Sequence, residues 1–196
     1  FNLIKWNLNK SYLLDFSKKK INIASSIFIS SKNFTNLKTL FNQTNWQEAI
    51  IKPAISGAAK NTFRVNKVNC DDFENIFRKL CDKETMIFQI FLKSIISFGE
   101  ISLMVFGGEY SHSVRKIAKD GDFRVQDDHG GKVEIYYASD KEIEFAEQCI
   151  NLCLEMPLYA RVDIAYDNNN ELSLVELELI EPELWFRNNK KSAKLL

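Results

Sequence analysis

The sequence Arg161-Val-Asp163-Ile-Ala-Tyr166, the turn Asp167-Asn-Asn-Asn170 and the run Leu174-Val-Glu176-Leu-Glu178-Leu-Ile-Glu181-Pro182 form the most informative part of this chain. Two alternating runs joined by an asparagine-rich turn predict a β-hairpin. Side chains at positions i and i+2 of a strand share a face, so Arg161 should lie beside Asp163, and Glu176 beside Glu178. Val175, Leu177 and Leu179 should point to the opposite face. The paired hairpin would then carry three carboxylates and one guanidinium on one side.

Three carboxylates crowded onto one face repel one another unless a cation lies among them. Oxygen ligands of this kind suit Mg²⁺, which usually keeps several waters and bridges to substrate phosphates. A solvated strand face with unrelated charges explains the same alternation. The hairpin alone therefore leaves both a metal site and an ordinary exposed strand open.

Composition narrows the class of protein. The 196 residues suffice for one large or two small domains, and 45% hydrophobic with 12% aromatic residues is typical of a globular chain. Lys+Arg and Asp+Glu number 26 each, so the zero net charge gives no reason to expect nucleic acid or a membrane surface as partner. The sequence opens without a long apolar run, so neither a signal peptide nor a membrane span is expected. Because residue 1 is Phe, we expect the chain to be part of a longer protein.

The four cysteines, Cys70, Cys81, Cys149 and Cys153, show no CxxC or Cys/His spacing typical of a metal site. Cys149 and Cys153 are one helical turn apart, as expected of small buried apolar residues. We therefore expect a reducing, cytoplasmic location.

The remaining patterns predict an α+β chain with antiparallel hairpins. Helices are expected at residues 10–19, from a cap at Asn33-Phe-Thr35 to residue 41, at 70–81, and at 139–154 after the capping box Ser139-Asp-Lys-Glu142. Strands are expected at residues 25–29, 46–52, 62–68, 85–92, 99–106, 109–116 and 133–137. Residues 119–132 read as a long polar loop that could close over a ligand, and a composition change near Thr85 indicates two lobes.

Several polar residues outside the hairpin admit a functional and an ordinary explanation. Lys52 ends an apolar strand before the small-residue loop 53–61, so it could hold a phosphate or be a surface lysine. Gln89 lies within an apolar strand and could meet a purine edge or be a satisfied half-buried amide. Glu100 could accept a hydrogen bond from a ribose or be an exposed strand end. Lys10, just before a helix, indicates little by itself.

Two further stretches carry basic residues. In Tyr110-Ser-His112-Ser-Val-Arg115-Lys116, Lys116 shares a face with His112, and Arg115 faces the other way. These side chains could hold phosphate oxygens or discourage edge-to-edge aggregation. Arg124 and His129 lie in the glycine-flanked loop, and no role is assigned to His129.

Taken in order, these segments resemble the ATP-grasp superfamily over nearly the whole chain. Within that superfamily they are similar to the branch of glutathione synthetase-like enzymes, ribosomal-protein glutamate ligases and the cycloserine-biosynthesis ligase, the last group being most similar in Gly121–Gln126 and Val175–Pro182. The resemblance rests on Lys10, Ala49-Ile-Ile-Lys52-Pro53, Phe88-Gln89-Ile-Phe91, Gly99-Glu100-Ile-Ser, Arg115-Lys116, Gly121-Asp-Phe-Arg124 with Gly130-Gly131, and Arg161-Val-Asp163 with Glu176-Leu-Glu178.

The resemblance implies a particular fold and domain organisation. The ATP-grasp fold has two α+β lobes whose antiparallel sheets enclose a nucleotide cleft. Residues 1–20 would be a helical segment leading into this region, residues 21–90 the small lobe, and residues 91–196 the large lobe with the metal site. The N-terminal domain that precedes the ATP-grasp region in this family would be absent from the chain.

The resemblance also implies an ATP- and Mg²⁺-dependent ligase, with Mn²⁺ as an alternative metal, that joins a carboxylate to an amine or thiol through an acyl phosphate. Asp163, Glu176 and Glu178 would hold the metal, and Arg161 would stabilise the acyl phosphate. The implied nucleotide and substrate contacts are Lys10 and Lys52 for the α- and β-phosphates, Gln89 and Phe91 for adenine, Glu100 for ribose, and Arg115, Lys116 and Arg124 for phosphate or a substrate carboxylate.

The chain departs from the family pattern at one position of the implied metal site, which argues against equating it with glutathione synthetase. Glutathione synthetases carry Glu-x-Asn as their final metal pair, and Glu176-x-Glu178 adds a negative charge here. A nucleotide-binding regulatory or scaffold domain without ligase chemistry, or an α+β binding module without nucleotide, remain alternatives. Expected partners are a nucleotide and small carboxylate or amine substrates, with no nucleic acid or membrane; a homo-oligomer would be in keeping with the superfamily.

Overall fold

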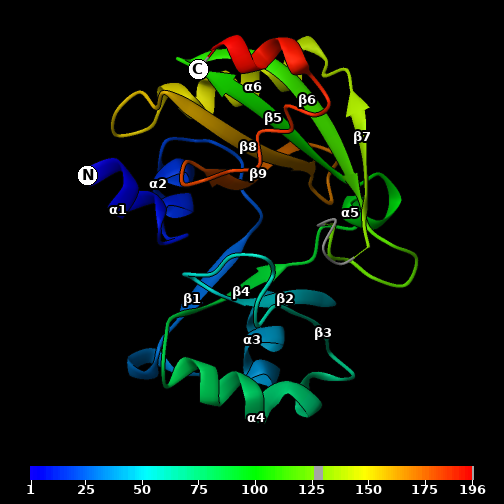
Figure 1. The fold of residues 1–196 in the computed structure, drawn as a ribbon. Helices are drawn as coiled ribbons and strands as arrows, with labels where there is room; N and C mark the ends of the chain where they lie inside the picture. The colour runs from blue at the N-terminus through cyan, green and yellow to red at the C-terminus, as the bar shows by residue number, and fades with distance from the viewer. Residues whose placement is uncertain (126–129, 196) are drawn as a thin grey trace. The chain divides into compact units, whose positions relative to one another are not determined.

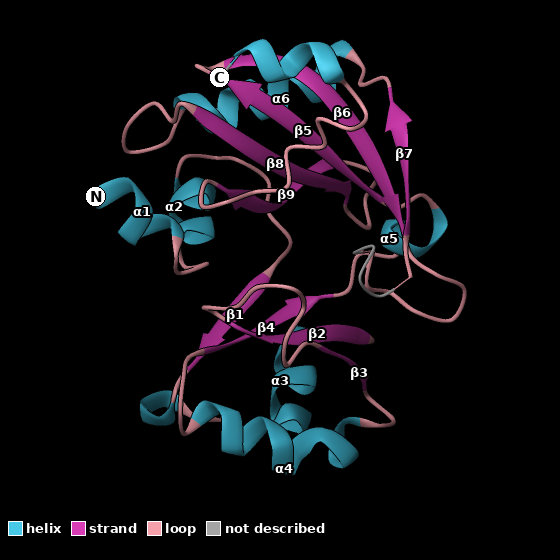
Figure 2. Cartoon of the chain, in the orientation of Figure 1, coloured by secondary structure: helices cyan, strands magenta, loops and turns pink. Residues whose placement is uncertain are grey.

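The computed structural model describes residues 1–125 and 130–195, which form two compact units (Figure 1). Unit 1 contains Phe1–Ile23 and Leu92–Leu196, and unit 2 contains Ala24–Phe91. Each unit consists of one antiparallel sheet with helices packed on it (Figure 2). The predicted α+β class is therefore confirmed. The first 23 residues group with the C-terminal part of the chain, so unit 1 is built from two separate stretches of sequence.

Unit 2 has a four-stranded sheet in the order β1-β4-β2-β3. Its strands are β1 (Ser26–Ile29), β2 (Glu48–Pro53), β3 (Phe63–Asn66) and β4 (Met86–Ile90). Helices α3 (Leu37–Thr44) and α4 (Cys70–Cys81) cover one face, where Ile51 and Phe88 pack against Phe41 and Phe77. The alternate residues of β2 and β4 point to the second face of the sheet. Within unit 2, α3 and α4 both lie on the first face (Figure 1).

The beginning of α3 differs from the prediction. A cap at Asn33-Phe-Thr35 was expected, but the Asn33 side chain instead accepts from the Ser30 amide at 2.6 Å in the short 3-10 turn η1 (Ser31–Asn33). Asn36 caps α3, accepting from the Thr39 amide at 2.8 Å. The predicted position was wrong because several closely spaced Asn and Ser residues can each cap a turn, and sequence alone does not rank them.

Unit 1 has a five-stranded sheet in the order β7-β6-β5-β8-β9. Helices α1 (Asn2–Asn7), α2 (Tyr12–Lys18) and α6 (Asp140–Asn151) supply side chains to the core on one face, and the short helix α5 (Ser94–Ser97) lies outside the sheet. The strands are β5 (Glu100–Phe106), β6 (Glu109–Ile117), β7 (Lys132–Tyr136), β8 (Tyr159–Tyr166) and β9 (Leu172–Glu178).

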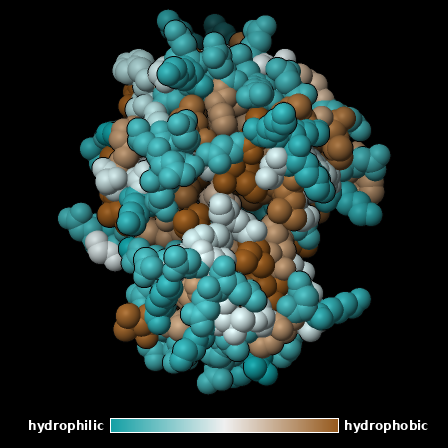
Figure 3. All heavy atoms as spheres, turned by 180° about the vertical axis from the view of Figure 1, so that it is seen from behind, coloured by the Kyte–Doolittle hydropathy of each residue, from teal (hydrophilic) through white to brown (hydrophobic). Residues whose placement is uncertain are grey.

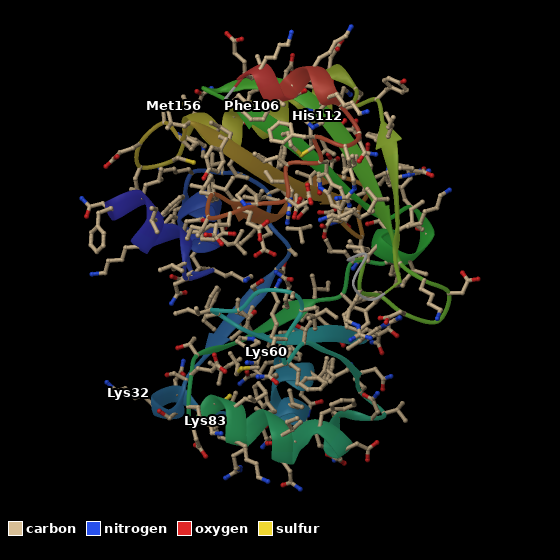
Figure 4. All side chains as sticks on the ribbon, viewed as in Figure 1. Lys32, Lys60, Lys83, Phe106, His112 and Met156 are labelled. Atoms are coloured by element: carbon tan, nitrogen blue, oxygen red, sulfur yellow. The ribbon has the colours of Figure 1, made fainter. Side chains whose placement is uncertain are left out.

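The C-terminal segment covers one end of the opposite face of this sheet. Leu184 and Trp185 pack on Met104, Phe106 and Val114, and the 3-10 helix η3 (Lys190–Leu195) follows. His112 stacks on Phe106 here, with ring centroids 6.5 Å apart (Figure 4). The His112 ring nitrogens contact the Leu184 carbonyl at 2.9 Å and the Ser192 hydroxyl at 3.1 Å. The other end of the same sheet face is not part of this apolar cluster.

Most predicted elements have structural counterparts. The predicted capping box is confirmed, since the Ser139 amide donates to the Glu142 carboxylate at 2.7 Å at the start of α6. The sequence patterns did not predict α1 and α5, which are only 6 and 4 residues long. Residues 126–129 of the expected 119–132 loop lie outside the described residues.

The predicted strict alternation in the final strand was wrong at one position. Asp163 pairs with Glu176 but Ile164 pairs with Leu174, so a bulge leaves Val175 unpaired. Leu174, Leu177 and Leu179 enter the core, and Val175 is only half-buried. A bulge places one extra residue on one strand and resets the alternation there.

Hydrophilic residues spread over much of the visible surface of each unit when seen from behind (Figure 3). Among the residues that the structure describes, no helix combines the length and apolar character needed to cross a membrane.

Candidate active site

Four neighbouring strands of unit 1 bring charged side chains onto one sheet face. Asp163 of β8 lies opposite both Ser102 of β5 and Glu176 of β9, and Arg161 lies opposite Glu178. The alternate residues of the same strands, including Val162 and Leu177, enter the hydrophobic core on the other face. The predicted sharing of a face by Arg161, Asp163, Glu176 and Glu178 therefore agrees with the observed register. On β5 and β6, Glu100 and Lys116 extend this face as directly opposed residues.

Asp163 lies at the centre of the charged face and is 2% exposed. Its carboxylate accepts from the Ser102 hydroxyl at 2.5 Å, the Arg161 guanidinium at 2.9 Å and the Lys116 ammonium at 3.1 Å. Burial alone would raise the Asp163 pKa, but the Arg161 and Lys116 charges and the hydrogen bonds hold that pKa well below its usual range. Asp163 is therefore ionised and held in one orientation.

Lys116 joins Asp163 to Glu100. Its ammonium forms ion pairs with both carboxylates, and it is itself 4% exposed. Burial favours the neutral amine, but Asp163 and Glu100 outweigh it and raise the Lys116 pKa. In the structure, the Glu100 carboxylate is thus engaged by a lysine of the neighbouring strand. The proposed ribose contact of Glu100 stays a prediction.

The two glutamates of β9 each meet a basic side chain. Glu176 pairs with Lys10 at 3.1 Å, and Glu178 pairs with Arg161 at 2.6 Å. Burial, together with the neighbouring Asp163 and Glu176 carboxylates, raises the Glu178 pKa to about 7 despite the Arg161 charge. The sequence predicted that these crowded carboxylates need a nearby cation. In the structure, basic side chains of the chain itself provide part of that positive charge.

The charged face carries a net negative charge that a further cation could neutralise. The four carboxylates Glu100, Asp163, Glu176 and Glu178 face three basic groups, Lys10, Lys116 and Arg161, a formal excess of one negative charge. Hard oxygen donors on one face fit Mg²⁺ by donor type.

The described residues do not form a complete metal cage by themselves. Within residues 1–125 and 130–195, no group of three or more His, Cys, Asp or Glu side chains is arranged to hold a metal ion. Mg²⁺ in nucleotide sites typically uses one or two carboxylates plus waters and phosphates, so an all-protein cage is not required. The carboxylates thus fit a metal that arrives with phosphate ligands, although each now contacts a basic side chain.

Unit 2 places two predicted nucleotide contacts on the second face of its sheet. On β2 and β4, Ile50 lies opposite Gln89 and Lys52 opposite Ile87, so Lys52 and Gln89 share this face. Gln89 is buried and donates to the Ser26 hydroxyl at 2.9 Å, in line with the satisfied-amide alternative. Phe91 is buried under the Arg64 guanidinium, which lies 4.0 Å from its ring centroid.

The structure does not bring Arg115 and Arg124 to the charged face. Arg115 lies opposite Ile101, a core residue, and pairs with Glu134 while its guanidinium covers the Phe98 ring at 4.8 Å. Arg124 pairs with the nearby Asp122 at 2.7 Å in the loop that follows β6. Their proposed phosphate or substrate contacts stay predictions.

Sequence reasoning missed Ser102, which fixes one Asp163 oxygen from β5. The signal was available, because Ser102 is two residues from Glu100 and must share its face in a strand. It also missed Asn7 and Tyr12, whose side chains bond to the backbone of β9. Nothing in the local sequence connects these two residues to a strand about 170 positions away.

Comparisons with known proteins identify the family and the fold of this chain. Residues 9–175 match the family model described as the ATP-grasp domain of prokaryotic glutathione synthetase. The cycloserine biosynthesis protein DcsG of Streptomyces lavendulae is 25% identical over 197 residues, covering 93% of this chain and 64% of DcsG. The chain thus spans less than two thirds of that relative.

Solved structures show the same fold. The crystal structure of D-cycloserine synthetase DcsG superposes with a TM-score of 0.85 at 21% identity, covering 99% of this chain and 69% of that one. A D-alanine–D-alanine ligase from Bacillus anthracis complexed with ATP gives 0.69 at 14% identity, covering 96% and 61%. The ATP-grasp ligase PsnB with a phosphomimetic precursor variant, Mg and ADP gives 0.69 at 16% identity, covering 99% and 59%. With the family match over most of its length, the chain belongs to the family of prokaryotic glutathione synthetase ATP-grasp domains.

Proposed function

We propose that the protein of which this chain forms part is an ATP- and Mg²⁺-dependent ligase that joins a small-molecule carboxylate to an amine or thiol through an acyl phosphate. The observation that carries the proposal is the charged face of unit 1, where Arg161, Asp163, Glu176 and Glu178 lie together in register. Family membership and the ligase neighbours support an ATP-dependent ligase in general. The C–N bond, the acyl phosphate and a cytoplasmic location are our proposals.

The acidic side chains of this face are proposed to bind the metal–nucleotide complex. Asp163, Glu176 and Glu178 would be the metal ligands, exchanging part of their contacts with basic side chains for Mg²⁺, or Mn²⁺ in its place. When bound, Mg²⁺ supplies positive charge that offsets the charge of the β- and γ-phosphates. Lys10 and Lys116 would then be released from part of their carboxylate pairing and could bind phosphate oxygens.

Unit 2 would contribute to nucleotide binding through the second face of its sheet. Lys52 is proposed to contact the α- and β-phosphates, and Gln89 and Phe91 the adenine. The Gln89 amide already donates to Ser26, so adenine recognition would use its carbonyl oxygen or the neighbouring backbone. Glu100 as ribose contact would require release from Lys116.

The proposed reaction has two steps. A substrate carboxylate oxygen attacks the γ-phosphorus of ATP, forming the acyl phosphate and releasing ADP. The nucleophile then attacks the acyl carbon, and phosphate leaves. Arg161 is held by three hydrogen bonds to Asp163 and one ion pair to Glu178. These contacts preorganise its guanidinium to stabilise negative charge on the acyl phosphate and the tetrahedral intermediate.

Release of ADP by the full-length protein, measured over a panel of amino acids and hydroxamates, tests the proposal. Asp163→Asn should lower the rate by on the order of a hundredfold or more, because a central preorganised charge is lost. The alternative, a nucleotide-binding regulatory domain without chemistry, predicts Mg-ATP binding with no substrate-dependent ADP release. An Asp163→Asn protein as active as the unmodified one would contradict the site assignment.

A further inference from the structure

Strand β9, which carries Glu176 and Glu178, lies at the edge of its sheet. Its inner side pairs with β8, but the bulge at Asp163/Ile164 interrupts that pairing and leaves Val175 unpaired. An edge strand with an interrupted ladder is prone to local opening unless its free side is covered. The direction of its carboxylates therefore depends on what holds the outer edge.

The N-terminal segment occupies that outer edge. Ile23 forms a parallel bridge with Leu174, and the Leu174 amide donates to the Asn22 carbonyl at 2.9 Å. Beyond Leu174, side chains replace backbone as hydrogen-bond partners. The Leu177 amide donates to the Tyr12 hydroxyl at 2.8 Å, and this hydroxyl lies 3.1 Å from the Leu177 carbonyl, to which it donates.

Asn7 continues this pairing around Glu178. Its side-chain amide donates to the Leu177 carbonyl at 2.8 Å, and its carbonyl oxygen accepts from the Leu179 amide at 3.1 Å. A donor to one residue and an acceptor from the residue two further on is the pattern of a neighbouring parallel strand. Tyr12 and Asn7 are 1% and 7% exposed, so water does not compete freely for these bonds.

The bonds fix the backbone on both sides of Glu178 and immediately after Glu176. The orientation of the peptide planes at Leu177 and Leu179 determines where the two carboxylates leave the strand. Lys10, between Asn7 and Tyr12 in sequence, pairs with Glu176 at 3.1 Å. One short segment thus contacts the backbone and one carboxylate of the same strand.

We propose that Tyr12 and Asn7 are positioning residues for the metal–nucleotide site, acting through the backbone of β9 on Glu176 and Glu178. The inference rests on the proposed function, because it takes these carboxylates to be the ligands of a nucleotide-bound metal. Loss of groups that orient metal ligands typically costs about 10- to 100-fold in metal affinity or activity.

The test uses the full-length protein with Tyr12→Phe, which removes the hydroxyl and keeps the ring against Trp6 and Phe16. The matched control is Tyr166→Phe, which removes a tyrosine hydroxyl of the same unit that donates to Glu142 at 2.9 Å. Asn7→Ala is the second variant and decides the question if Tyr12→Phe does not fold. In hydrogen exchange, the backbone amide of Leu177 should exchange faster in Tyr12→Phe than in the unmodified protein. The backbone amide of Leu179 should exchange faster in Asn7→Ala, and neither amide should change in Tyr166→Phe.

The second readout is the Mg²⁺ or Mn²⁺ concentration for half-maximal ADP release. We expect it to rise about tenfold or more in both variants, with turnover at saturating metal largely kept, and to stay unchanged in Tyr166→Phe. A merely destabilised protein would have a smaller active fraction and an unchanged metal midpoint.

Faster exchange with an unchanged metal midpoint would overturn the positioning role, as would unchanged exchange. If the unmodified protein releases no ADP with any substrate of the panel, the proposed function fails separately. In that case the affinity for Mn²⁺-ATP is measured by titration calorimetry on the same variants. This affinity then replaces the metal concentration for half-maximal ADP release as the readout. Binding as tight in both variants as in the control would then overturn the inference.

Discussion

Replacing Lys116 with Met tests the charge arrangement of the proposed site without any ligand. Lys116 is 4% exposed and pairs with Asp163 at 3.1 Å and with Glu100. Met has a similar unbranched shape but no charge, so Glu100 loses the ammonium while it stays buried. Removing one partner of a buried ion pair costs about 3–5 kcal/mol of unfolding free energy. At roughly 2–4 °C per kcal/mol for a chain of this size, Tm should fall by about 6–20 °C.

The loss should depend on pH in a defined direction. Burial already raises the Glu100 pKa, and removal of Lys116 would raise it further. Between the unfolded and folded pKa values the folded state binds more protons, so the free energy of unfolding decreases as pH rises through this range. The deficit of Lys116→Met should therefore be smaller near pH 5 than at pH 8.

Differential scanning calorimetry at several pH values measures this, with Lys116→Met/Glu100→Gln as the matched second variant. The double variant removes the unpaired carboxylate and should regain stability relative to Lys116→Met. A loss below about 1 kcal/mol for the single variant, or a double variant no more stable than the single one, would show that Lys116 does not neutralise a buried Glu100.

Three further predictions concern His112, Gly99 and Arg161. Burial lowers the His112 pKa, so the folded state favours the neutral ring. The resulting contribution to the free energy of unfolding is present above the unfolded pKa of about 6.5 and is lost as pH falls through the folded pKa. Urea titrations at several pH values should show a smaller loss of unfolding free energy in His112→Gln. Gly99 has a φ of +105°, and a Cβ at this position would collide with the Lys116 carbonyl. Thermal melts should therefore show a strongly lowered Tm for Gly99→Ala. The control Gly57→Ala, which adds a Cβ where no atom lies within 4 Å, should leave Tm unchanged. Arg161→Lys keeps the charge but loses the fork that holds Asp163, so ADP release should fall about tenfold or more, as steady-state assays would show.

The local part of the candidate site could be predicted from the sequence. Asp163, Glu176, Glu178 and Arg161 belong to one hairpin, and the period of two along each strand fixes their common face once the strands pair. The capping box at Ser139 and the helix Cys70–Cys81 follow equally local rules. Such features need only neighbouring residues and backbone geometry.

The groups that neutralise the carboxylates could not be predicted in the same way. Lys116 and Asp163 are 47 residues apart, and Lys10 meets Glu176 from the opposite end of the chain. These contacts exist only after β5, β6, β8 and the N-terminal helices have packed together. The bulge at Val175 likewise depends on how β8 and β9 pair rather than on either strand alone.

We propose that the acidic face of unit 1 binds ATP through a divalent metal. Calorimetric titration measures this binding. ATP is titrated into the unmodified protein and into Glu176→Gln/Glu178→Gln, each in Mg²⁺ and in EDTA. We expect ATP to bind the unmodified protein in Mg²⁺, with a parallel stabilisation of about 2.7 kcal/mol at a hundred times Kd, and binding to be strongly weakened both by EDTA and by the double substitution. Equal ATP affinity in Mg²⁺ and EDTA, or in the unmodified and substituted proteins, would show that Glu176 and Glu178 do not bind the nucleotide through a metal.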